Sequence, residues 1–124
     1  MSNFSFAIAS DVHIFASGGV PTNFPKVISQ LASLSPRFVV VSGDATSGNP
    51  DDGASRDKVA LWWRAFRGAM QALTDAGIPV IGLEPSCILS FRDEIPALMK
   101  SETAHKLASL ALTFEEFLAR EHKA

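Results

Sequence analysis

The chain has 124 residues, of which 47% are hydrophobic and 19% charged, and its formal net charge is −2. This composition is typical of one globular domain and excludes a disordered chain, while the small charge, without a Lys/Arg cluster, argues against a nucleic-acid partner. No apolar run reaches the roughly 18 residues of a membrane span, and the N-terminus lacks a signal-peptide pattern, so we predict a cytoplasmic protein without a membrane partner. The chain has one cysteine, which excludes an internal disulfide.

The first part of the chain predicts a strand, a helix and a second strand. Residues 5–10 are apolar enough for a buried strand, and Asn23 is the predicted N-cap of a helix over 24–34 that carries one apolar stripe. Residues 37–42 form a second, continuous apolar run that suits a parallel sheet buried on both faces. The segment 45–55 is rich in Gly, Ser, Asn and Asp, so we expect a polar loop outside the core.

A long amphipathic helix is expected next, over residues 57–76, with Gly77 as its C-terminal stop. A third strand follows over 78–81, with a proline at its start, where a missing N–H is tolerated. The pair Trp62 and Trp63 lies at helical spacing, which favours core packing over a ligand platform. The residues expected on the inner side of this helix are Val59, Trp62, Trp63, Phe66, Met70 and Leu73.

The last third of the chain is predicted to be helical. Ser90 followed by Asp93 indicates one helix start, which Pro96 interrupts. Ser101 opens another helix, and Thr113 with Glu116 forms a capping box for the last one.

The order strand–helix–strand–helix–strand predicts an α/β fold. We expect one compact domain, residues 1–124, built as three layers. Its parallel sheet is short, with about three strands, and the strand at 5–10 is central. Helices cover both faces of the sheet.

Polar side chains follow two of these strands. Asp11 and His13 come after the first strand, on the same side of the chain, and Asp44 comes after the second. Neighbouring parallel strands end at one edge of a sheet, where α/β folds build their sites. Carboxylate and imidazole ligands suit Mn, Fe or Zn, so these three residues are candidate metal ligands. The alternative is strand-end polarity without a metal.

The motif Asp11-x-His13, then Gly43-Asp44, then the third strand resembles the opening of calcineurin-like metallophosphoesterases over residues 4–82. The resemblance implies a phosphoester hydrolase in which Asp11 and His13 hold a first metal and Asp44 bridges to a second. Small phosphoesters are the substrates it implies.

The chain departs from that family after the third strand. The family has Gly-Asn-His followed by Asp or Glu there, and this chain has Gly82-Leu83-Glu84-Pro85. The family's later Gly-His-x-His is also missing, since the remaining histidines, His105 and His122, lie in helical segments. Glu84 is either a substitute ligand or part of a solvated turn. These departures predict weak or absent hydrolysis.

Residues 77–124 resemble a different family, through Gly-Leu-Glu-Pro-Ser-Cys at 82–87 and Phe-Arg-Asp-Glu at 91–94. Both strings are similar to a segment of the cysteine-rich (CCG) domain of FAD-linked iron–sulfur oxidoreductases. One cysteine cannot hold a cluster that takes about four thiolates, so no flavin and no intact iron–sulfur cluster are expected. Cys87 is either a remnant of a redox site or a small, partly buried thiol.

The two resemblances together predict a fusion of two α/β fragments, natural or engineered, with a phosphoesterase-like half over 1–82 and a helical segment over 83–124. The leading hypothesis is a degenerate metallophosphoesterase-like domain that binds a divalent metal. The alternative is a non-enzymatic scaffold that self-associates through apolar C-terminal helices. A weaker hypothesis is a redox accessory fragment that uses Cys87. The candidates for the self-associating patch are Phe114, Phe117 and Leu118.

Overall fold

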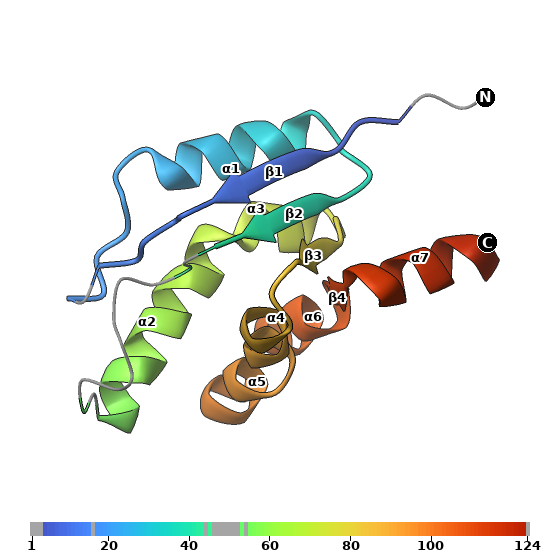
Figure 1. Ribbon diagram of the computed structural model, residues 1–124. Coiled ribbons are helices and arrows are strands. Elements are labelled where there is room, and N and C mark those ends of the chain that lie inside the picture. The colour runs from blue at the N-terminus through green and yellow to red at the C-terminus, as the bar shows by residue number, and fades with distance from the viewer. Residues whose placement is uncertain (1–3, 16, 44, 46–52, 54, 124) are drawn as a thin grey trace.

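The computed structural model describes residues 4–15, 17–43, 45, 53 and 55–123 (Figure 1). None of the helices in this part of the chain combines the length and the apolarity that crossing a membrane requires. The elements in chain order are β1 (Ala7–Ser10), α1 (Phe24–Ser33), β2 (Val39–Ser42), α2 (Arg56–Ala69), α3 (Gln71–Asp75), β3 (Val80–Gly82), α4 (Pro85–Arg92), α5 (Glu94–Met99), α6 (Glu102–Leu110), β4 (Ala111–Thr113) and α7 (Phe114–Lys123).

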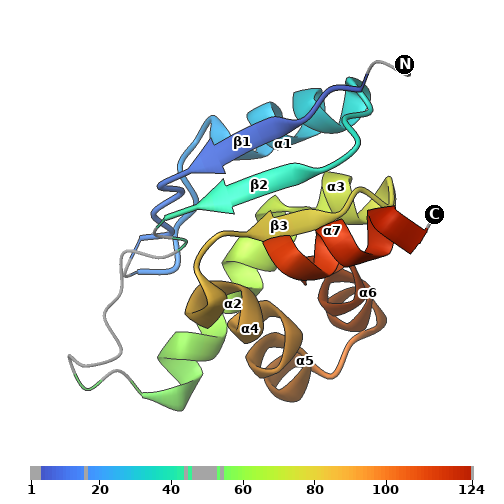
Figure 2. The ribbon, with the colours of Figure 1, turned by 45° about the vertical axis from the view of Figure 1, so that its right-hand side comes forward.

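The strands form one parallel sheet in the order β1-β2-β3-β4, so the α/β fold class is confirmed. Right-handed crossovers between strands added in one direction place every connecting helix on the same face of the sheet. Among the described helices, α7, which follows the last strand, is the one that lies against the opposite face, next to β3 and β4 (Figure 2). One face of the sheet is therefore covered more completely than the other.

The position of the first strand differs from the prediction. β1 is an edge strand and not the central one, and the short strand β4, which was not predicted, adds a fourth strand at the far edge. Ala7 and Ala9 of β1 face the connecting helices and are half-buried, whereas Phe6 and Ile8 point to the other face and are exposed. The prediction of a buried first strand is therefore wrong: one face of β1 is exposed and the other is half-buried.

The first helix matches its predicted range but buries less than expected. Of the apolar residues at helical spacing in this segment, Ile28 is fully buried, while Val27 and Leu34 are exposed. Asn23 stands at the N-cap position, but its side chain makes no capping hydrogen bond there.

The main core lies between the sheet and the connecting helices. It joins sheet residues such as Val39 and Val80 to helix residues from both halves of the chain. Phe66 of α2 stacks on Phe91 of α4 with their ring centroids 4.9 Å apart, and Trp63 packs edge-on against both rings. Trp62 is buried and Trp63 is half-buried against the core, so the prediction that the tryptophans serve core packing is confirmed.

The predicted helix over 57–76 is divided at Met70 into α2 and α3. Met70 leaves helical geometry with φ −87° and ψ 2°, and its carbonyl accepts hydrogen bonds from both Leu73 and Thr74, which tightens the turn. Gly77 ends α3 as predicted. Its φ of 68° is one that glycine adopts without strain, and the next N–H, of Ile78, closes back on the carbonyl of Leu73.

The helix after the third strand begins earlier than predicted. α4 starts at Pro85, a residue favoured in a first helical turn, and it contains Ser90 instead of beginning there. Asp93 precedes the next helix, α5, but makes no side-chain cap. Pro96 is accommodated because it lies in the first turn of α5, where backbone N–H groups have no intrahelical partner.

The last two helices begin as predicted. The Ser101 hydroxyl accepts a hydrogen bond from the N–H of Ala104 at 3.2 Å and caps α6. At α7 the capping box is reciprocal, since Glu116 N–H donates to the Thr113 hydroxyl at 3.3 Å and Thr113 N–H donates to the Glu116 carboxylate at 3.0 Å.

The capping box makes a pH-dependent contribution to stability. The Thr113 N–H and the Arg92 guanidinium hold the pKa of the Glu116 carboxyl below its ordinary value of 4.5. A lowered folded-state pKa stabilises the fold above the unfolded value, and this stabilisation disappears as the pH falls through the folded pKa. We expect Glu116→Gln to lose at most about 1 kcal/mol at pH 7, because the exposed ion pair is screened by solvent.

The measurement is urea unfolding of both proteins at pH 7 and at a pH below the folded pKa of Glu116. The difference between them should vanish in acid, where the glutamate is also neutral. Glu115→Gln, on the same turn of α7, is the control for removing a charge. An unchanged difference at both pH values would contradict this assignment.

Candidate functional site

Asp11 and His13 lie together at the carboxyl end of β1. Their neighbours Val12 and Ile14 are buried, and the N–H of Ile14 donates to the carbonyl of Ala45 at 3.0 Å. This anchoring leaves Asp11 and His13 directed outward, with 60% and 46% of their side-chain surface exposed. Ala45 itself is buried, so the prediction of a loop outside the core is wrong at its first residue.

The backbone at these two residues is strained. Asp11 has φ 51° and His13 has φ 49°, in the left-handed region that non-glycine residues seldom occupy. Each such residue costs of order 1 kcal/mol, and such strain concentrates at functional sites. The conformation brings the two side chains together, with Asp11 Oδ1 3.6 Å from His13 Nε2.

The end of β2 is shaped to accept the Asp11 side chain. The Ser10 hydroxyl lies within hydrogen-bond distance of the Asp11 carboxylate and, at 2.6 Å, of the Ser42 carbonyl, and its single proton serves one of them at a time. Gly43 has φ 100°, and a Cβ on it would lie 3.3 Å from Asp11 Oδ1. A glycine here therefore gives the carboxylate room beside the second strand.

The other predicted site residues are placed differently. Asp44 lies outside the described residues. Glu84 is exposed in the bend directly before α4, as the solvated-turn alternative expects, and its carbonyl accepts the N–H of Ile88 in the first turn of that helix. Cys87 belongs to α4, but its side chain is outside the described part of the structure. His105 and His122 are exposed on α6 and α7.

The distance between Asp11 and His13 is close to what one metal ion requires. Two ligand atoms that each lie about 2.1 Å from an ion, at an angle of about 90–109°, are roughly 3.0–3.4 Å apart. Among the described residues, no three His, Cys, Asp or Glu side chains gather into a metal-binding group, and Glu84 does not join the pair. The described part of the chain thus supplies two candidate ligands.

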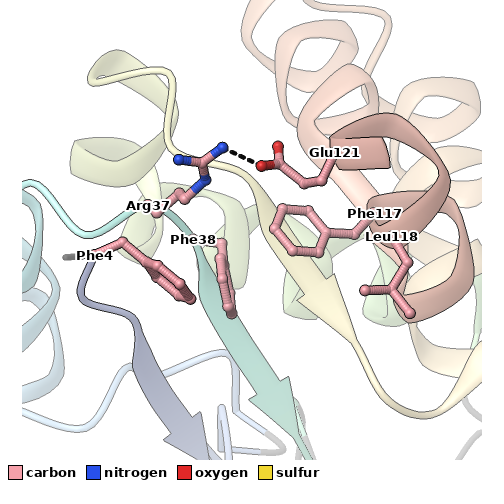
Figure 3. Close-up of a pocket in the computed structure, with 6 residues that line it drawn as sticks. All are labelled: Phe4, Arg37, Phe38, Phe117, Leu118 and Glu121. Atoms are coloured by element: carbon pink, nitrogen blue, oxygen red, sulfur yellow. Dashed lines mark hydrogen bonds and ion pairs between the residues drawn. The ribbon is translucent and has the colours of Figure 1, made fainter. Parts of the chain in front are cut away.

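A second feature, which the sequence did not predict, is an apolar groove between the open face of the sheet and α7 (Figure 3). Its volume is about 360 Å³. Phe38, just before β2, is at its centre, with its ring centroid 4.6 Å from that of Phe117 and 5.2 Å from that of Phe6. The lining residues are Phe4, Arg37, Phe38, Phe117, Leu118 and Glu121.

One end of the groove is polar. Arg37 and Glu121 form an ion pair across it, and the Arg37 guanidinium lies 6.0 Å from the centre of the Phe4 ring. Through these two contacts, Arg37 links Phe4, near the N-terminus, to Glu121 on the last helix. One signal in the sequence could have indicated the groove. Large Phe6 and Ile8 alternate with small Ala7 and Ala9, so the two faces of the first strand carry side chains of different size.

Comparison with protein-family models, with curated proteins and with solved structures finds no match for this chain. The two family resemblances therefore stay predictions drawn from their motifs.

Proposed function

We propose that this chain is a divalent-metal-binding domain of the metallophosphoesterase type, with weak or absent phosphoester hydrolysis. The observation that supports the proposal best is the 3.6 Å approach of Asp11 Oδ1 to His13 Nε2 at a strained strand end. Asp11 and His13 would hold the ion, and Asp44, which follows Gly43 in the sequence, is the proposed third ligand. A bound ion would supply positive charge against a phosphoryl oxygen.

The neighbouring residues support the ligands. A hydrogen bond from the Ser10 hydroxyl would orient the Asp11 carboxylate, and Gly43 keeps the space beside it open. Weak activity is expected because the sequence has Gly-Leu-Glu-Pro where the family that it resembles has an asparagine ligand and a histidine.

The test is thermal unfolding of the metal-free protein with and without excess Mn²⁺. An ion present at about 100 times its Kd stabilises the fold by roughly 2.7 kcal/mol, or roughly 10 °C in Tm for a domain of this size. Asp11→Asn, His13→Ala and Asp44→Asn should each remove most of this shift. Asp75→Asn, an exposed carboxylate on α3, should keep it.

The result that would overturn the proposal is no Mn²⁺ shift in the wild type, or the same shift in Asp11→Asn. Hydrolysis is measured separately with p-nitrophenyl phosphate and its bis-ester. Any activity should require the metal and be lost in Asp44→Asn. Metal-independent hydrolysis would place the reaction elsewhere.

A further inference from the structure

The face of the sheet that carries α7 is only half covered. One row of side chains crosses this face in register, from Ile8 on β1 through Val40 and Ile81 to Leu112 on β4. Ile81, next to α7, is completely buried, whereas Ile8 at the open edge is 63% exposed. The helix that follows β4 is therefore too far along the sheet to cover β1 (Figure 2).

The uncovered surface is continuous and apolar. The groove joins Phe4 on the strand side to Leu118 on α7, and both residues line it. The five large side chains of this surface, which we call the open-face patch, are 48–63% exposed and together present roughly 500 Å² of apolar area. They are Phe4, Phe6, Ile8, Phe114 and Leu118.

We infer that the open-face patch is covered by a second copy of this chain, related by a two-fold axis that places the two α7 helices antiparallel and side by side. Two such patches bury about 1,000 Å² in total, which is the lower bound for a specific interface. The α7 of each copy fills the groove of the other and covers its β1 and β2. Leu118 lies near the axis.

The charges on α7 fit this arrangement. Its first turn carries Glu115 and Glu116, of which Glu116 pairs with Arg92. Its last turn carries Arg120 and Lys123 with His122, while the negative charge of Glu121 in that turn is paired with Arg37. Antiparallel pairing places the acidic end of each helix beside the basic end of the other. The pattern is self-complementary, as a two-fold interface requires.

The test is sedimentation of the whole chain over a wide range of concentrations, with a metal chelator present so that the result is independent of the proposed metal site. We expect a reversible dimer. Phe6→Glu and Leu118→Glu should each raise its Kd by roughly tenfold or more. Leu34→Glu, which changes an exposed leucine at the end of α1, should leave the Kd unchanged.

A cross-linking experiment tests the axis itself. Leu118→Cys in a Cys87→Ser background should form a disulfide-linked dimer on mild oxidation, and Leu34→Cys in the same background should not. Far-UV circular dichroism establishes that each variant is folded. Three results would overturn the inference: a monomer at every concentration, open-ended aggregates, or a dimer that Leu118→Glu leaves intact. The last result is the one expected if two copies pair through the edge of β1 instead.

Discussion

Replacing Phe66 by alanine is expected to lower the free energy of unfolding by about 3–5 kcal/mol. Phe66 is fully buried, and its ring stacks on Phe91 and meets the edge of Trp63. Removing the ring would leave a cavity between α2 and α4, in the centre of the core. The loss would be a large share of the 5–15 kcal/mol that usually stabilises a domain.

The same experiment reports on the two halves of the chain, since Phe66 lies in one predicted fragment and Phe91 in the other. Urea unfolding, followed by tryptophan fluorescence and by circular dichroism, should give one coincident transition before and after the substitution. Phe15→Ala, which removes an exposed ring, is the matched control and should cost much less. Two separate transitions in the wild type would contradict a shared core.

Local signals in the sequence were sufficient for most of the elements. The apolar runs around Val39–Ser42 and Val80–Gly82 suit parallel strands that are covered by helices, and the sheet contains both. Ser101 and Thr113 mark helix starts because their hydroxyls satisfy backbone N–H groups within three residues. Such signals act over one helical turn, so they can be recognised without knowledge of the fold.

The arrangement of the elements depended on distant contacts. The sequence of residues 5–10 suits either a central or an edge strand. Its position in the sheet depends on how distant helices and strands pack against it, and this information is not contained in the segment itself. β4 escaped prediction because three residues give no periodicity. At the proposed metal site, the strand-end position of Asp11 and His13 was predictable. Their left-handed backbone and the space that Gly43 leaves were not.

The second large effect is expected at Gly82, the last residue of β3. A Cβ on this residue would lie 2.5 Å from the Cβ of Ile88 and 2.9 Å from its Cγ1. Ile88 is fully buried on α4, and its Cβ is fixed by the helix backbone, so the helix would have to move away from the end of β3. We expect Gly82→Ala to destabilise the fold by about 3 kcal/mol, at the upper end of the usual cost of overpacking.

A control substitution shows whether the destabilisation of Gly82→Ala comes from the collision with Ile88 or from replacing a glycine in general. Gly68→Ala, at an exposed position in the last turn of α2 where the added Cβ would meet no neighbour within 4 Å, should instead stabilise the fold by about 0.5–1 kcal/mol. If the collision involved only the flexible end of Ile88, Ile88→Val would restore stability to Gly82→Ala. Because the closest atom is Cβ itself, we expect no rescue in thermal or urea unfolding of the double variant. Rescue, or a Gly82→Ala protein as stable as the wild type, would mean that α4 does not rest directly on the end of β3.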